Sequence, residues 1–168
     1  PTYLPLGCHK VKISVAKWDM YLGTRKHSLD AKSRLTLPAD FRKQVGDQVC
    51  LVPLKDALYG FAPVEYEAWV NSFFENGERH FDPRSRRDVE LKRRLTAHAV
   101  MVDLDSAGRV ALGKLDAAEP GARARLGLDH DVTVVGAGDH FEIWNSAKWD
   151  ERNVNFADDL DALMFDDT

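Results

Sequence analysis

The sequence has few of the features that mark a specialised class of protein. It contains only two cysteines in 168 residues, Cys8 and Cys50, and no CxxC pair, which argues against a disulfide framework and against a cysteine-rich zinc site. No apolar run is long enough to span a bilayer, and residues 1–19 lack the apolar core of a signal peptide. These absences predict a cytoplasmic protein without a membrane partner.

Motifs of catalysis and cofactor binding are also missing. The chain has no nucleophile elbow, no P-loop, no dinucleotide-binding glycine motif and no HExxH zinc motif. Its six histidines form no HxxxH pair. We therefore expect no catalytic residue, no metal, no cofactor and no small-molecule substrate, and an enzyme is the weakest of the function classes considered.

Charge is distributed unevenly along the chain. The net charge is −4, yet residues 20–45 hold six basic residues against two acidic ones, a local charge of +4. Residues 150–168 hold seven acidic residues against one arginine, a local charge of −6. The cationic segment suits a polyanionic partner, although a solvated charged surface also explains it. A second basic cluster at 84–94 fits either nucleic acid or an exposed connector helix with acidic partners on neighbouring subunits.

The hydrophobic pattern predicts a β-rich chain with short helices. Pro120 and Gly121 interrupt the helical pattern at 113–126, so two short turns are expected there. Alternation and apolar runs predict strands at 21–30, 34–37, 48–54, 58–64, 98–105, 109–112, 131–137 and 140–144. Helical spacing predicts helices at 38–45, 64–75 and 85–97, and one from about residue 146.

The sequence repeats itself. "HSLDAKSRLTLP" near residue 30 returns as "MVDLDSAGRVAL" near residue 105, so Asp30 matches Asp105 and Arg34 matches Arg109. Downstream, "DQVCLVPL" matches "HDVTVVGA". Each copy of roughly 50 residues is too small to bury a good core alone. The repeats therefore predict two halves packed about a pseudo-twofold axis into one β-barrel.

Each copy carries an Asp-x-x-x-Arg motif across an expected hairpin turn. The aspartate accepts hydrogen bonds from backbone N–H groups in such a turn, and Gly108 in the second copy supplies a left-handed conformation. An exposed Asp–Arg pair is worth about 0–1 kcal/mol, so one copy alone indicates only a turn. Two copies would present Arg34 and Arg109 as a matched pair of guanidinium groups, which suits phosphate or base-edge contacts.

Three blocks resemble the MraZ family of bacterial transcriptional regulators, which are built from two SpoVT-AbrB-type domains. The blocks are "YLGTRKHSLDAKSRLTLPADFR", "DLDSAGRVAL" and "VVGAGDHFEIWNSAKW", and the resemblance covers Met20 to about Asp150. It implies a β-rich α+β fold, in which two duplicated swapped-hairpin halves form one pseudo-twofold barrel with peripheral helices. It also implies ring-shaped homo-oligomers, octamers or dodecamers, that bind double-stranded DNA through the Asp-x-x-x-Arg face.

The resemblance further implies a nucleoid-associated repressor or regulator of a cell-division and cell-wall operon that includes its own gene. The operator is expected to contain tandem G-rich repeats. The alternative is a ring-forming AbrB-like scaffold or protein-interaction module without specific DNA recognition. The predicted DNA contacts are Arg34, Lys32, Arg109, Arg25 and Lys26, and the predicted turn scaffold is Asp30, Asp105, Ser33 and Gly108. Ser33 stands where the family commonly has glycine, so its turn must tolerate a Cβ.

The expected domain organisation has five parts. Residues 1–19 form a leader, 20–76 a first repeat with its helix, 77–98 a connector helix, 99–150 a second repeat and 151–168 an acidic tail that is disordered or loosely helical. The leader is either a flexible arm or foreign to the native protein. The codons for Trp18-Asp19 must read TGG-GAY. One explanation of the leader is therefore that operator or ribosome-site DNA was translated from a misplaced start codon, and that the native protein begins at Met20.

Overall fold

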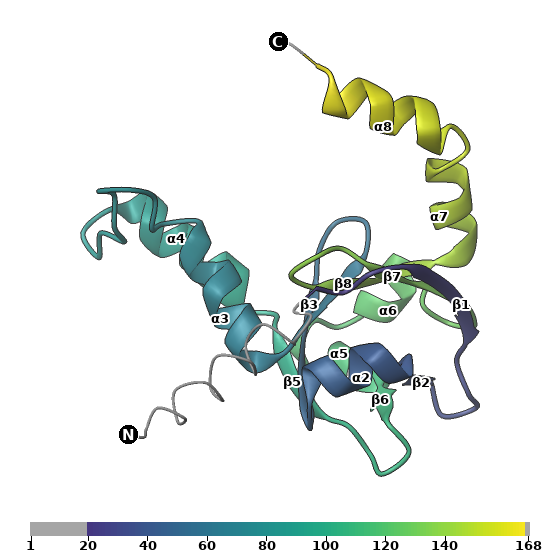
Figure 1. Ribbon diagram of the computed structural model, residues 1–168. Helices are drawn as coiled ribbons and strands as arrows, with labels where there is room; N and C mark the ends of the chain where they lie inside the picture. Colours follow the sequence, from purple (N-terminus) through teal and green to yellow (C-terminus); the bar gives the residue numbers. More distant parts are fainter. Residues whose placement is uncertain (1–19, 167–168) are drawn as a thin grey trace, which may run out of the picture.

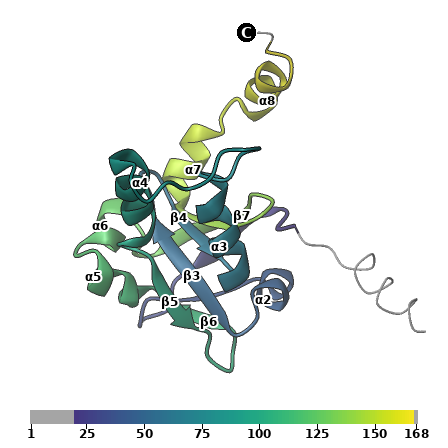
Figure 2. The same ribbon diagram turned by 90° about the vertical axis from the view of Figure 1, so that its left-hand side faces the viewer.

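The computed structural model describes residues 20–166 as an α+β fold with a large antiparallel sheet (Figures 1 and 2). The strands are β1 (Thr24–Ser28), β2 (Arg34–Thr36), β3 (Gln48–Pro53), β4 (Leu58–Phe61), β5 (Val100–Asp103), β6 (Arg109–Ala111), β7 (Asp131–Gly136) and β8 (Phe141–Asn145). The helices are α2 (Ala39–Val45), α3 (Pro63–Ser72), α4 (Arg86–Thr96), η1 (Leu112–Lys114), α5 (Leu115–Ala118), α6 (Ala122–Leu126), α7 (Ser146–Arg152) and α8 (Phe156–Met164). The α+β class expected from the sequence is confirmed.

The strand order carries the internal symmetry of the sequence. Six strands form one sheet in the order β1-β7-β8-β4-β3-β5, and β2 pairs separately with β6. Strands β1 to β4 of the first repeat correspond to β5 to β8 of the second. If corresponding labels are exchanged, the strand order of the large sheet is the same when read from its opposite edge. The pseudo-twofold axis thus passes between β8 and β4 and again through the β2–β6 pair. Closure of the sheet into a barrel stays a prediction, because β1 and β5 are edge strands in the hydrogen-bonded order.

The sequence predicts that the two strands flanking each Asp-x-x-x-Arg turn pair with each other, and this prediction is wrong. β1 pairs with β7 and β5 pairs with β3, so each first strand joins the other repeat. The turn itself closes locally, since the Asp30 N–H donates to the Arg34 carbonyl at 3.1 Å and the Ser33 N–H donates to the Asp30 carbonyl at 2.9 Å. Beyond Arg34 the chain leaves β1 because β2 pairs with β6 instead. The exchange fits the swapped-hairpin arrangement of the two halves.

An aromatic cluster joins the sheet to α2 in the core. Tyr21, Phe41 and Phe141 are buried, with ring centroids 5.2–5.6 Å apart. The hydroxyl of Tyr21 donates to Glu65 at 2.7 Å, and Glu65 also accepts the N–H of Ala62 at 2.9 Å, which fixes the start of α3. Leu35 and Val110, which face each other in the β2–β6 pair, are also fully buried. The pair is therefore held on the core by its central residues.

The outer helices differ between the repeats. α3 and α4 pack on each other through the buried side chains Val70, Phe74 and Leu95 (Figure 1). Pro120 separates α5 from α6, as expected. The acidic tail is expected to be either disordered or loosely helical. It contains the helix α8. The predictions for the leader, Cys8 included, lie outside the described residues.

Candidate nucleic-acid interface

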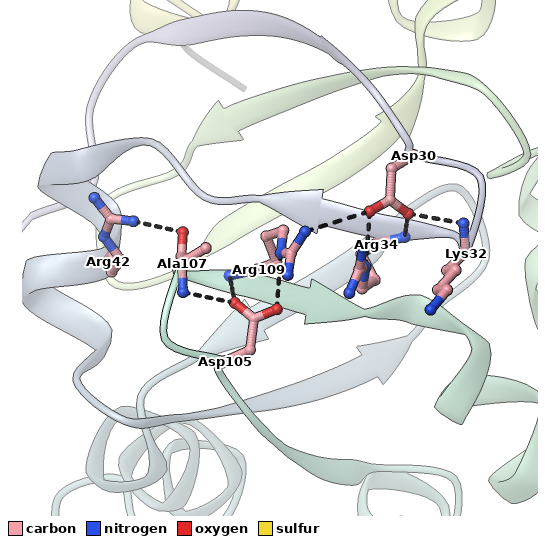
Figure 3. A network of polar contacts seen from close by, with 7 residues as sticks. All are labelled: Asp30, Lys32, Arg34, Arg42, Asp105, Ala107 and Arg109. Carbon is pink, nitrogen blue, oxygen red and sulfur yellow. Dashed lines mark hydrogen bonds and ion pairs between the residues drawn. The ribbon is translucent and has the colours of Figure 1, made fainter.

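The first Asp-x-x-x-Arg turn is organised by one carboxylate. Oδ1 of Asp30 accepts the backbone N–H groups of Lys32 and Arg34, each at 2.9 Å (Figure 3). Oδ2 of Asp30 accepts Nε of Arg34 at 2.7 Å. The carboxylate therefore fixes both the turn and the plane of the guanidinium group.

The second turn repeats this geometry almost atom for atom. Oδ1 of Asp105 accepts the N–H groups of Ala107 at 3.0 Å and Arg109 at 2.9 Å. Oδ2 accepts Nε of Arg109 at 2.7 Å (Figure 3). The match shows that the sequence repeat encodes a repeated three-dimensional structure.

Pairing of β2 with β6 places the two turns side by side. Arg34 lies opposite Ala111, and Arg109 lies opposite Thr36, in a register symmetric about Leu35 and Val110. Nη1 of Arg109 is 3.9 Å from Oδ2 of Asp30, so the polar network crosses from one repeat to the other (Figure 3). Arg34 and Arg109 therefore form a matched pair on one two-stranded ribbon.

The aspartates of both turns, Asp30 and Asp105, have lowered pKa values. The backbone N–H of Arg34, followed by its side chain, lowers the pKa of Asp30 below the usual aspartate value, and Arg109 does the same for Asp105. Both carboxylates are therefore ionised at neutral pH and hold their arginines by charge-assisted hydrogen bonds. The side chains of Arg34 and Arg109 are 28% and 33% exposed. Within residues 20–166 the terminal nitrogens of Arg34 form no hydrogen bond, which leaves them available to a ligand.

The backbone conformation at the turns explains the serine that replaces glycine. Ser33 has a φ of +59°, and its counterpart Gly108 has a φ of +75°. A left-handed serine is uncommon. Nη1 of Arg123 donates to Oγ of Ser33 at 2.7 Å, which ties the turn to α6. Ser33 therefore tolerates its Cβ and gains a hydrogen bond.

Two arginines that sequence reasoning missed brace the turns. Arg123 of the second repeat contacts Ser33 of the first. Arg42 of the first repeat donates to the carbonyl of Ala107 in the second at 2.9 Å, as Figure 3 shows. Arg42 lies eight residues after Arg34, and Arg123 lies fourteen after Arg109. Because the spacings differ, the repeat pattern could not reveal them as equivalent.

Three predicted contacts lie differently from the arginine pair. Lys32 sits in the first turn with an exposed side chain, next to Arg34 (Figure 3). On β1, Arg25 makes a two-pronged ion pair with Asp40, at 2.6 and 2.9 Å, and lies over the ring of Phe41. Lys26 bonds the carboxylate of Asp150 at 2.9–3.0 Å. The charges of Arg25 and Lys26 are thus already paired within the chain.

Residues 20–166 contain no cluster of three or more side chains able to hold a metal ion. In the same part of the chain, no helix is both long and apolar enough to cross a membrane.

Comparison with known proteins assigns the fold to a family. A family model described as "MraZ protein, putative antitoxin-like" matches residues 20–88 and 95–159. Each matched segment contains one Asp-x-x-x-Arg turn. The chain belongs to the MraZ family.

Curated MraZ relatives match along most of their length. The chain is similar to "Transcriptional regulator MraZ" of Corynebacterium urealyticum, with 34% identity over 143 residues that cover 85% of this chain and 93% of the relative. The protein of that name from Syntrophomonas wolfei is 33% identical over 138 residues, covering 81% and 88%. The one from Leuconostoc mesenteroides is 30% identical over 147 residues, covering 86% and 94%.

Proposed function

We propose that this chain is a non-catalytic, DNA-binding transcriptional regulator, as the names of its MraZ relatives suggest. It would contact double-stranded DNA through Arg34 and Arg109 on the β2–β6 ribbon. The observation that carries the proposal is the matched pair of Asp-x-x-x-Arg turns, in which equal hydrogen bonds hold two partly exposed guanidinium groups on one ribbon. A two-stranded ribbon fits the major groove of B-DNA.

The fixed guanidinium groups suit recognition of guanine. Arginine bonds O6 and N7 of guanine through two parallel N–H groups, which is the commonest specific contact in the major groove. Asp30 and Asp105 hold Nε, so the terminal nitrogens of each arginine point from a fixed plane. Less side-chain entropy is then lost on binding. This supports the expected operator of tandem G-rich repeats, and Lys32 beside the first turn adds a phosphate contact.

Binding at tandem repeats requires several linked sites. A homo-oligomeric ring, octameric or dodecameric as the family resemblance implies, would offer one arginine pair per subunit. Linked weak contacts then give avidity without any new contact. We propose that this assembly acts as a repressor or other regulator on the nucleoid, at the operon for cell division and cell wall that contains its own gene. The domain limits expected above are part of the same proposal, with one turn in each of 20–76 and 99–150.

The test compares DNA upstream of the gene with a scrambled duplex of the same composition. Binding is measured by fluorescence anisotropy from about 50 to 200 mM salt, where the slope of log affinity against log salt is about −0.9 per phosphate contact. We expect tighter binding to the upstream DNA at every salt concentration. Equal affinity for both duplexes would favour the alternative function, a ring-forming scaffold without specific DNA recognition.

A further inference from the structure

Helix α8 carries an apolar stripe that nothing in the described chain covers. Phe156, Leu160, Leu163 and Met164 follow helical spacing and are 57%, 44%, 79% and 60% exposed. No α8 side chain belongs to any hydrophobic cluster within residues 20–166. The helix projects away from the sheet at the end of α7 in both views (Figures 1 and 2).

A helix in this position needs a partner surface. α8 has nine residues, and an isolated helix shorter than about 12–15 residues is only marginally stable in water. Packing of an apolar face supplies most of the stability of helices in proteins. The equivalent helix pair of the first repeat shows such packing, because α4 lies on α3 through Val70, Phe74 and Leu95. α8 has no such contact within residues 20–166.

The negative charge of α8 favours a positively charged partner surface. Asp158, Asp159 and Asp161 form no ion pair within the described residues, and α8 contains no basic residue. The segment 84–94, which leads into and forms most of α4, has six exposed basic residues against two acidic ones, a net charge of +4. Arg84, Arg86 and Arg87 have no acidic partner within 4 Å in residues 20–166. The two helices thus have opposite uncompensated charges.

The cationic segment also borders a groove that contains apolar side chains. An open groove at the start of α4 is lined by Pro83, Arg84, Ser85, Arg86, Val89, Glu90 and Arg93, and Glu90 is ion-paired with Arg93 and Arg94. Pro83 and Val89 give it an apolar floor between the arginines. Leucine or phenylalanine side chains of α8 could enter this groove while the aspartates meet the arginines around it. The groove therefore offers apolar side chains together with Arg84 and Arg86, whose charges are unpaired within residues 20–166.

We propose that α8 docks on the cationic segment 84–94 of a second copy of this chain. α8 and α4 lie on opposite flanks of the molecule (Figure 1), so α8 does not reach its own α4. Each copy then gives α8 to the next and receives α8 from the previous one. Such a head-to-tail contact generates a closed ring when the rotation between subunits closes. This contact rests on the proposed homo-oligomer, whose subunits it joins, and does not depend on DNA binding.

The test uses two charge-reversal variants of the full chain, measured without DNA by light scattering after gel filtration. One variant carries Asp158→Lys, Asp159→Lys and Asp161→Lys, and the other carries Arg84→Glu, Arg86→Glu and Arg87→Glu. Each alone has two helices of like charge, so each is expected to lose the wild-type mass. In an equimolar mixture every α8 meets a segment of opposite charge, so the wild-type mass is expected to return.

The rescue separates a lost contact from a lost fold, because a variant that fails to fold does not assemble in the mixture. The proposal is overturned if the wild type is a monomer, if either variant alone keeps the wild-type mass, or if the mixture does not recover it. An arginine variant that keeps its mass but binds DNA more weakly would make segment 84–94 a DNA surface instead.

A matched pair of neutral substitutions tests the apolar contribution. Leu163 and Val64 are 79% and 77% exposed, but only Leu163 lies on α8. Leu163→Ser is expected to raise the protein concentration needed for assembly by about tenfold or more, since a leucine side chain would lose its burial. Val64→Ser should leave that concentration unchanged, and equal effects of the two substitutions would overturn the proposal.

Discussion

The guanidinium group of Arg123 donates to the hydroxyl oxygen of Ser33 across 2.7 Å, from the second repeat to the turn of the first. Arg42 makes the reciprocal contact with the backbone of Ala107. Each proposed DNA-contacting turn is therefore braced by a helix of the other repeat. Both repeats therefore contribute to the position of the arginine pair.

The brace predicts coupling between Ser33 and Arg123. Ser33→Gly relieves a left-handed serine, worth about 1–2 kcal/mol, but loses a hydrogen bond and adds backbone entropy to the unfolded chain. We therefore expect a change of less than about 1 kcal/mol in the free energy of unfolding. A double-mutant cycle with Arg123→Gln, followed by urea unfolding, should show a coupling of about 0.5–1.5 kcal/mol. Additive effects would show that the contact is absent in solution.

The second turn should not accept the serine of the first. Gly108 has a φ of +75°, and a Cβ built there would lie 2.0 Å from Nη1 of Arg42. Gly108→Ser is expected to cost about 1–2 kcal/mol of unfolding free energy through backbone strain, and to displace Arg42. Gly113→Ser is the control, since nothing lies within 4 Å of its Cβ position and its φ is not left-handed. Equal costs for the two substitutions would contradict this description of the turn.

A largely buried ion pair beside β4 predicts a pH dependence. His140 stacks on Tyr59, and its two ring nitrogens lie 2.7 Å from Asp139 and 2.8 Å from Glu142. Burial alone would lower the pKa of His140, but hydrogen bonds to Glu142 and Asp139 outweigh it and raise the pKa. Burial would likewise raise the pKa of Glu142, but hydrogen bonds from His140 and Trp144 lower it. Both shifts favour the charged pair.

The raised histidine pKa fixes the direction of the effect. Protonated His140 stabilises the fold fully below the unfolded histidine pKa of about 6.5, and the stabilisation is lost as pH rises through the higher folded pKa. His140→Gln should therefore cost about 1.5–3 kcal/mol near pH 6 and clearly less near pH 9. Urea unfolding of both proteins at the two pH values measures this. A difference that grows toward pH 9 would mean that His140 is buried neutral.

The sequence predicted the repeats and most strands, because duplication and alternation are local properties of the chain. It could not predict that β1 would pair with β7, since alternation identifies a strand but not its partner. The local charge of the sequence assigned Arg25 and Lys26 to a cationic segment. The sequence spacing did not show that these residues form ion pairs with Asp40 and Asp150. Arg42 and Arg123 were missed because their contacts depend on how the two repeats pack.

The most direct test of the proposed DNA interface is operator binding by Arg34→Ala at about 0.15 M salt. Arg34→Ala is expected to weaken binding by about 1–3 kcal/mol if the residue contacts a base edge. Arg109→Ala should weaken it less, since Lys32 adds charge only to the first turn. Lys55→Ala removes the same charge from an exposed turn far from the ribbon in sequence, and it should have little effect. Undiminished binding by Arg34→Ala, with an unchanged oligomer mass, would contradict the assignment of this arginine pair to DNA.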